Sequence, residues 1–219
     1  MFFLRLSMKK PEEYRLKDLK KAVTIFKNGG VVIFPTDTVY GIGCRFDDQK
    51  ATERIYQIKK TPKNQKFPIL VSSIGQVRKL AKVGKVAQKL IEKYWPGGLT
   101  IILPSRHPER ERRIYSDSSA TPQNDTSKVG FRMPDSDLIR FLIEKIGVSI
   151  IGTSANFYGQ KPAKSFKNLD SQILELADLV IKGKCRRGIE STVVDATSDP
   201  PKILRKGAVD INSINQLTD

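Results

Sequence analysis

The chain has few of the residues that many enzymes use to bind metals or to form covalent intermediates: two cysteines and one histidine among 219 residues. Cys44 and Cys185 lie far apart in the sequence, so we expect neither a metal-binding pair nor a disulfide framework. His107 lies in a polar segment, where we expect a surface residue that is not part of a Ser-His-Asp set. The composition favours a site that binds and polarises its ligands over one that attacks them with a side chain.

Long apolar runs are also absent: no stretch approaches the roughly 18 residues that a membrane-spanning helix requires. In residues 1–10 the charges follow the apolar patch and no small-residue cleavage site appears, so we expect no secretory leader. Hydrophobic residues make up 39% and charged residues 28%, which is typical of a folded globular protein. These features predict a cytoplasmic protein.

Acidic residues are scarce relative to basic ones: 23 Asp+Glu stand against 39 Lys+Arg, a formal net charge of +16. A surplus of this size attracts polyanions. The lysines are spread along the whole chain, which argues against a disordered basic arm. A solvated, lysine-rich surface would explain the charge equally well, but we favour a nucleic-acid or nucleotide partner.

Apolar residues alternate between helical spacing and short β-branched runs, which predicts an α/β or α+β sheet in one domain. The predicted helices are 16–27, 48–59, 74–83, 86–94, 136–145 and 171–177, and the predicted strands are 31–35, 67–71, 99–103, 129–133, 148–152, 179–181, 192–195 and 202–204. Residues 104–128 are polar and rich in turn formers, so we expect a long surface loop there. The last residues are interpreted as a short tail.

Segment 31–43, VVIFPTDTVYGIG, has a buried-strand pattern that stops at Pro35 and opens into hydroxyls, a carboxylate and glycines. Ligands of α/β sheets bind just beyond the carboxyl ends of strands. The alternative is a threonine-rich turn that only reverses the chain. Polar residues also flank predicted strands in 149–163, SIIGTSANFYGQKPA, and in 187–195, RGIESTVVD, so we expect these segments to converge on one cleft.

Two lone arginines, Arg132 and Arg205, each follow an apolar strand. Their guanidinium groups suit bidentate contact with a carboxylate or a phosphate, although a structural salt bridge is an equally open interpretation for either one. The chain has neither a G-x-x-x-x-G-K-[ST] nor a G-x-G-x-x-G motif, so a nucleotide would be held by another scheme.

Six motifs, in the order FPTDTVYGIG, YWPGGLTIIL, VGFRMP, TSAN, GIESTVVD and ILRKGAV, resemble those of the YrdC-like threonylcarbamoyl-AMP synthases. The resemblance extends from Leu16 to Val209. It implies a single YrdC-like domain over 1–219, with a core of about 16–209 and short extensions at both ends. It also implies the family's α/β fold, a twisted mixed β-sheet flanked by helices with a concave basic cavity.

The activity that the resemblance implies is ATP-dependent synthesis of threonylcarbamoyl-AMP from L-threonine, bicarbonate and ATP, with release of pyrophosphate. Such a nucleotidyltransferase serves threonylcarbamoyladenosine modification of tRNA, so contact with tRNA or with tRNA-modification proteins is a further implication. Mg²⁺ would accompany ATP, held mainly by phosphate oxygens. Attack of a carbamate on the α-phosphate needs alignment and charge neutralisation rather than a protein nucleophile.

The resemblance also assigns roles to individual residues by motif. The threonine and carbamate end of the cavity would be formed by Thr36, Thr38, Tyr40, Arg132 and Ser191, with Arg132 on the threonine carboxylate. The nucleotide would be bound by Lys59, Ser154, Asn156 and Arg205, with Arg205 on its phosphates. Lys59 and Arg132 would be the catalytic residues, and no residue is assigned to a metal.

One position departs from the family pattern of a lysine, any residue and an arginine before a proline: residues 59–62 are KKTP, so Thr61 takes the place of the arginine. Threonine cannot replace a guanidinium fork, although Lys60, Lys63 or Lys66 could supply a point charge nearby. The sister YciO-like proteins also depart here, but they usually depart at Ser-Ala-Asn too, which this chain keeps. The alternatives to a synthase are a YciO-like, non-catalytic or weakly active RNA- or nucleotide-binding protein and, third, a generic nucleotide-binding protein.

Overall fold

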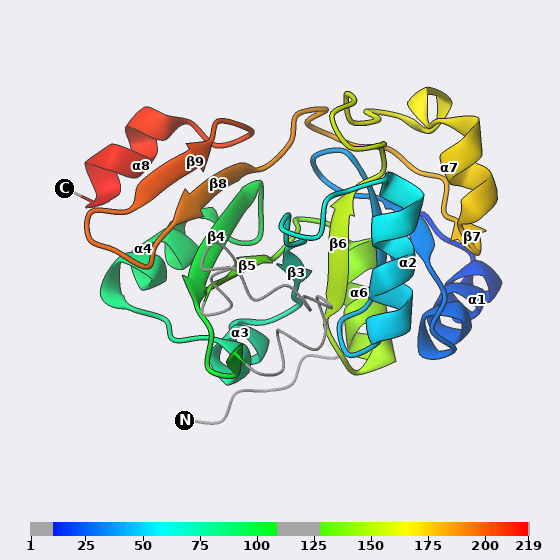
Figure 1. Ribbon diagram of the computed structural model, residues 1–219, viewed down its shortest axis with the longest axis horizontal. Coiled ribbons are helices and arrows are strands. Elements are labelled where there is room, and N and C mark those ends of the chain that lie inside the picture. Colours follow the sequence, from blue (N-terminus) through cyan, green and yellow to red (C-terminus); the bar gives the residue numbers. More distant parts are fainter. Residues whose placement is uncertain (1–10, 109–127, 219) are drawn as a thin grey trace.

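The computed structural model describes residues 11–108 and 128–218, and its centre is a nine-stranded mixed sheet (Figure 1). The strands are β1 (Val32–Pro35), β2 (Tyr40–Arg45), β3 (Ile69–Leu70), β4 (Leu99–Pro104), β5 (Lys128–Arg132), β6 (Ile150–Ser154), β7 (Leu179–Val180), β8 (Thr192–Asp195) and β9 (Lys202–Arg205). Their order is β7-β1-β2-β6-β3-β5-β4-β8-β9. The pairs β7–β1, β3–β5 and β4–β8 are parallel and the others antiparallel, which confirms the predicted mixed α/β fold.

Helices flank the sheet and bury its side chains in two clusters. The helices are α1 (Leu16–Lys27), α2 (Gln49–Lys59), α3 (Ile74–Leu80), α4 (Lys85–Tyr94), α6 (Asp137–Ile146), α7 (Ser171–Leu176) and α8 (Ile211–Thr218). Along β1, Val32 and Phe34 join the cluster formed by α1 and α6, whereas Ile33 joins the larger cluster formed by the other helices. This alternation follows from the two-residue period of a strand, so β1 is buried on both faces.

The polar segment after β1 forms a short turn and then a strand, which the sequence analysis did not predict. β2 pairs antiparallel with β1, so Gly41 lies opposite Phe34. A Cβ atom on Gly41 would lie 2.9 Å from Cε2 of the Phe34 ring, so this packing requires glycine. The predicted strand ends at Pro35, as β1 does, but a second strand, absent from the prediction, begins at Tyr40.

Helix α2 ends at Lys59 and carries this side chain to the sheet. Asp48 caps its N-terminus by accepting a hydrogen bond from the backbone N–H of Ala51 at 2.9 Å. Ala51 and Ile55 pack in the larger cluster. The helix stops at Lys60, whose φ of 53° is left-handed. The result is a lysine side chain that is buried at the end of a fixed helix.

The C-terminal residues form helix α8 rather than the expected tail. Ile211, Ile214 and Leu217 recur at helical spacing, a pattern that the sequence analysis did not use. Ile214 is fully buried, and the hydroxyl of Tyr94 on α4 donates to the carbonyl oxygen of Ser213 at 2.8 Å. These contacts hold α8 against α4, at the end of the sheet that β8 and β9 form (Figure 1).

The predicted strand 148–152 and the predicted loop 104–128 have different outcomes. β6 extends to Ser154, two residues beyond the predicted end, so Thr153 and Ser154 are strand residues. Most of the predicted surface loop 104–128, residues 109–127, lies outside the described residues. Pro104 ends β4 and Lys128 begins β5.

Within the described ranges, every helix is too short or too polar to span a bilayer.

Candidate functional site

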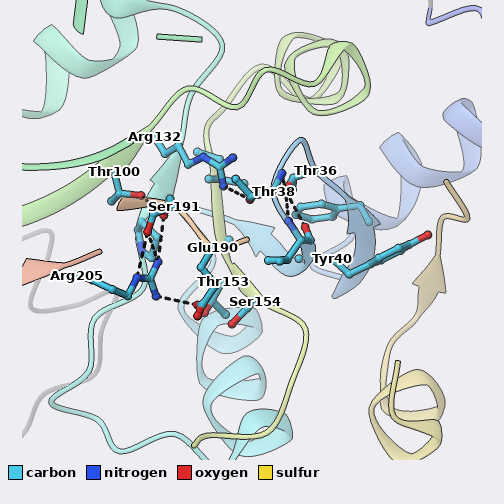
Figure 2. Close-up of a pocket in the computed structure, with 16 residues that line it drawn as sticks. Thr36, Thr38, Tyr40, Thr100, Arg132, Thr153, Ser154, Glu190, Ser191 and Arg205 are labelled. Atoms are coloured by element: carbon cyan, nitrogen blue, oxygen red, sulfur yellow. Dashed lines mark hydrogen bonds and ion pairs between the residues drawn. The ribbon is translucent and has the colours of Figure 1, made fainter. Parts of the chain in front are cut away.

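Two adjoining cavities are lined by residues of the central sheet and of the segments beside it, and Figure 2 shows the inner cavity. The inner cavity has a volume of about 90 Å³, and the outer groove has a volume of about 710 Å³. They are continuous because six residues line both: Pro68, Thr100, Thr153, Ser154, Glu190 and Arg205. A small recess with polar and apolar lining residues that opens into a larger groove can hold two ligands side by side.

The floor of the inner cavity is part of the sheet itself. Gly152 on β6 and Leu70 on β3 both line it. A Cβ atom on Gly152 would lie 2.5 Å from Cδ1 of Leu70, so the two strands can pack this way only because position 152 is glycine. Any larger residue would push Leu70 into the cavity or move the strands apart.

Arg132, at the end of β5, is held by three protein acceptors. Its Nη2 donates to Oδ1 of Asp37 at 2.5 Å, its Nη1 to Oγ1 of Thr38 at 2.8 Å and its Nε to the carbonyl oxygen of Gly97 at 3.0 Å. The side chains of Arg132 and Asp37 are only 8% and 1% exposed. Burial lowers the pKa of Arg132, which the charge of Asp37 opposes, and the guanidinium remains protonated.

Asp37 lies between two guanidinium groups. Its Oδ2 is buried without a hydrogen-bond partner in the described structure, but the Nε of Arg187 lies 3.8 Å away. The backbone N–H groups of Arg187 and Gly188 donate to the carbonyl oxygens of Asp37 and Thr38 at 2.9 and 2.8 Å. These bonds fix the turn after β1 against the segment that leads into β8.

Arg205, at the end of β9, has a similar set of partners but is more exposed. Its Nη1 donates to Oε1 of Glu190 at 2.8 Å, and its Nη2 donates to Oγ and the carbonyl oxygen of Ser191 at 3.1 and 3.0 Å. The side chains of Arg205 and Glu190 are 45% and 33% exposed. This guanidinium is positioned by the protein and still open to a ligand from the outer groove.

Hydroxyl groups complete the wall of the inner cavity. Thr36 Oγ1 lies 3.0 Å from Oγ1 of Thr38 and donates to the carbonyl oxygen of Val39 at 2.7 Å. Thr100 Oγ1 lies 2.8 Å from Oγ of Ser191. The hydroxyls of Thr38 and Ser191 accept hydrogen bonds from Arg132 and Arg205. All four hydroxyls can also donate a hydrogen bond to a ligand or accept one from it.

Tyr40 lines the inner cavity, but its hydroxyl does not face the other predicted residues. The hydroxyl donates to the carbonyl oxygen of Gly183 and accepts from the N–H of Gly183, both at 2.8 Å. Figure 2 shows its ring directed away from Arg132, Glu190 and Arg205. The backbone end of Tyr40 therefore lines the cavity, and its hydroxyl links β2 to the segment after β7 by hydrogen bonds.

Lys59 is the buried cation of the outer groove. Its Nζ donates to the carbonyl oxygens of Ser154 and Asn156, both at 2.6 Å. Burial lowers the pKa of Lys59 to about 8, which the negative charge of Glu190 opposes. The lysine thus links α2 to the end of β6 and places a positive charge beside the groove.

Thr61 and Asn156 also line the outer groove. The Oγ1 of Thr61 and the Oδ1 of Asn156 are buried, and neither has a hydrogen-bond partner in the described structure. The Nδ2 of Asn156 donates to the carbonyl oxygens of Phe157 and Gln160, both at 2.8 Å. Thr61 is uncharged, so the buried cation in this wall of the outer groove is Lys59.

The cavities bring together every residue that the sequence analysis assigned to the site. The inner cavity is lined by Thr36, Thr38, Tyr40, Arg132, Ser154, Ser191 and Arg205, and the outer groove by Lys59, Ser154, Asn156 and Arg205. Three residues with polar side chains line the inner cavity but were not assigned: Thr100, Thr153 and Glu190. All three lie inside motifs of the resemblance, so their position in these motifs was the available signal. Within 11–108 and 128–218, no group of three His, Cys, Asp or Glu side chains is placed to hold a metal.

A family model named Sua5_yciO_yrdC, with the description "Telomere recombination", matches residues 24–207. A protein of Escherichia coli named "Uncharacterized protein YciO" is 28% identical over 202 residues, which cover 92% of this chain and 94% of that relative. The threonylcarbamoyl-AMP synthase of Pyrococcus abyssi is 32% identical over 208 residues, which cover 94% of this chain and 58% of that longer protein.

Solved structures give the same two neighbours. P. abyssi Sua5 in complex with L-threonine superposes with a TM-score of 0.80 at 29% identity, over 95% of this chain and 58% of that one. E. coli YciO superposes with a TM-score of 0.80 at 28% identity, over 93% of this chain and 96% of that one. The chain is thus similar in length to YciO and spans less than three fifths of the P. abyssi protein.

Proposed function

The chain belongs to the Sua5, YciO and YrdC family, and from this premise we propose that it is an ATP-dependent threonylcarbamoyl-AMP synthase. The observation that carries the proposal is the pair of cavities. The inner one is small and lined by hydroxyls and two guanidinium groups, and it opens into a groove large enough for a nucleotide. The structure of P. abyssi Sua5 with L-threonine supports an amino acid as the inner ligand.

In this proposal the residues act by position and charge. The amino acid carboxylate binds on the Arg132 side, where Thr36 and Thr38 supply hydroxyls. The nucleotide lies in the outer groove, with its phosphates near Arg205 and Lys59. The carbamate then attacks the α-phosphate in line and pyrophosphate leaves. Fixed cations that face the developing phosphate charge lower the barrier, and no side chain has to form a covalent bond.

Mg²⁺ enters this scheme as a companion of ATP. The acidic residues that line the outer groove are Glu190 and Asp195, and Glu190 already accepts from Arg205. Mg²⁺ in nucleotide sites is commonly held by one or two carboxylates together with phosphate oxygens and water. The residues present fit that mode, in which the phosphates supply most ligands.

The proposed product serves tRNA modification, and a net charge of +16 favours electrostatic contact with RNA. That charge also supports the second candidate, a YciO-like protein that binds RNA or a nucleotide with little or no synthase activity. Thr61 is the specific observation in its favour, because this wall residue is neutral where the synthase pattern has an arginine. E. coli YciO also matches the chain over nearly the whole length of both.

Pyrophosphate release separates the two candidates. Purified protein with ATP and Mg²⁺ is assayed with and without L-threonine and with and without bicarbonate. The synthase releases pyrophosphate only when both are present, and Ser154→Ala lowers the rate by about tenfold or more while Ser198→Ala, at an exposed serine, leaves it unchanged. ATP binding without threonine-dependent release supports the YciO-like candidate, and restored release in Thr61→Arg would identify the neutral wall as the reason.

A further inference from the structure

One carboxylate side chain lines the inner cavity within the described ranges. Among the described residues that line it, the ionisable ones are Tyr40, Arg132, Glu190 and Arg205. The two guanidinium groups are permanently protonated, and the hydroxyl of Tyr40 is bonded to Gly183 outside the cavity. Glu190 is left as the candidate base, although the sequence analysis gave it no role.

Glu190 lies at the junction between the two cavities, which it lines together with Ser154 (Figure 2). Its backbone is fixed because its carbonyl oxygen accepts from the N–H of Ala208 at 2.8 Å, and Gly207 packs directly against it. Its side chain is one-third exposed and accepts from Arg205. An ionised carboxylate has about four acceptor positions, so it can keep Arg205 and receive a further donor.

The charges around the inner cavity suit a zwitterion. The Asp37–Arg132 and Glu190–Arg205 pairs present charges of both signs, and Arg187 beside Asp37 and Lys59 near Glu190 add positive charge. An α-amino acid carries a carboxylate and an ammonium group, which need partners of opposite sign. The guanidinium groups can take the carboxylate, and Glu190 is the lining carboxylate that the ammonium group can reach.

We propose that Glu190 binds the ammonium group of the amino acid and accepts its proton as the carbamate forms, an inference that rests on the proposed synthase function. In this step the ammonium nitrogen transfers one proton to the Glu190 carboxylate, and its lone pair forms the N–C bond to the carbon of bicarbonate. A C–O bond of bicarbonate breaks, and that oxygen leaves as water with the bicarbonate hydrogen and a second proton from the nitrogen. The products are the N-carboxylate, water and protonated Glu190.

Positive groups act on Glu190 from two other elements: Arg205 on β9 at 2.8 Å and Lys59 on α2. The phosphates of a nucleotide in the outer groove would lie on the same side. A proton on Glu190 can leave through this groove, to which the side chain is exposed. The same residue can therefore serve each turnover.

Glu190→Gln tests the proposal because glutamine keeps the shape and an acceptor oxygen for Arg205 but carries no charge and takes no proton. Glu175→Gln, at an exposed glutamate of α7, is the matched control. Calorimetry without ATP and Mg²⁺ is expected to show at least about tenfold weaker L-threonine binding in Glu190→Gln than in the wild type. The analogue 2,3-dihydroxybutanoate, which has a hydroxyl in place of the ammonium group, should bind equally to both variants and the wild type.

The pH dependence of pyrophosphate release distinguishes a base from a merely structural residue. At neutral pH, Glu190→Gln is expected to lower the rate by about 10²-fold, in the range typical of general-base catalysis. This deficit should shrink as pH rises, because solution then supplies the neutral amine. Parallel pH profiles of variant and wild type, or equal threonine affinity, would overturn the proposal.

The same data separate this inference from the synthase proposal. If the wild type releases pyrophosphate and Glu190→Gln behaves like Glu175→Gln, the role of Glu190 fails and the synthase stands. If the wild type binds threonine through Glu190 but releases no pyrophosphate, the ammonium subsite stands and the synthase fails. If the wild type does not bind L-threonine in the presence or absence of ATP, both are overturned.

Discussion

The site contains two guanidinium groups, each paired with a carboxylate, and in each pair the acidic residue is followed by a hydroxyl residue. Asp37-Thr38 holds Arg132, and Glu190-Ser191 holds Arg205. The distances are similar, at 2.5 and 2.8 Å for the ion pairs. Exposure differs greatly: the Arg132 side chain is 8% exposed and the Arg205 side chain 45%.

Burial changes what each pair does. A buried charge that loses its partner is costly, whereas an exposed pair gains little because water screens it. We therefore expect the Asp37–Arg132 pair to hold the turn after β1, β5 and Gly97 together. The Glu190–Arg205 pair can open towards a substrate at low cost. We expect the first pair to maintain the shape of the cavity and the second to exchange partners with a ligand.

The largest effect is expected from breaking the buried pair. Asp37→Ala leaves Arg132 buried without its carboxylate and should lower the free energy of unfolding by about 3–5 kcal/mol, measured by urea denaturation. Asp135→Ala, which breaks the exposed pair with Arg186, should cost less than about 1 kcal/mol. The double variant Asp37→Ala/Arg132→Met should recover part of the loss. Equal effects of Asp37→Ala and Asp135→Ala would contradict the comparison.

Removing a hydroxyl from each pair sharpens the same contrast. Thr38→Val keeps the side-chain shape but removes an acceptor of buried Arg132, so we expect a loss of about 1.5–3 kcal/mol in the free energy of unfolding. Ser191→Ala removes an acceptor of exposed Arg205 and should cost less than about 1 kcal/mol. A larger cost for Ser191→Ala than for Thr38→Val would reverse our assignment of the two roles.

Lys59 adds a third case, a buried cation held by neutral carbonyl groups. Burial lowers its pKa from 10.5 to about 8, so between these pH values the unfolded chain holds a proton that the folded chain has lost. The free energy of unfolding should therefore rise with pH in this window, by on the order of 1–3 kcal/mol relative to Lys59→Met. Below pH 8 both states hold the proton and the full cost of burial is present. A difference between the two proteins that does not change with pH would count against a buried, charged Lys59.

The smallest effect on stability is expected at the exposed pair. Arg205→Gln should change the free energy of unfolding by less than about 1 kcal/mol, because nearly half of the side chain is in water. The same variant should lose most of the threonine-dependent pyrophosphate release, since it removes a cation that faces the phosphates. Thermal and urea unfolding together with the release assay check both statements. A strongly destabilised Arg205→Gln protein would place this pair in the same class as Asp37–Arg132.

Much of the site could be predicted because its residues follow apolar strands. Thr36, Ser154 and Arg132 each lie at or just beyond a strand end, where side chains of an α/β sheet reach a ligand. The pairing of Arg132 with Asp37 could not be predicted, because these residues are 95 positions apart and no local pattern records their contact. The direction of the Tyr40 hydroxyl also depends on a distant partner, Gly183.

The errors in the fold have local causes. β2 was missed because Gly41 and Gly43 indicate a turn, whereas both are required by close packing on Phe34 and on β6. Helix α8 was missed because it is short, and its packing on α4 and in the larger core cluster contributes to its stability. In both cases, tertiary contacts outweigh local preference.

The most direct test of the synthase is to identify its product. Protein, ATP, Mg²⁺, L-threonine and ¹³C-labelled bicarbonate are incubated, and the mixture is analysed by mass spectrometry with unlabelled bicarbonate in parallel. We predict threonylcarbamoyl-AMP whose mass increases by the label, together with pyrophosphate, and no such product from Arg205→Gln. Intact ATP, or ATP breakdown without a labelled adduct, would contradict the account.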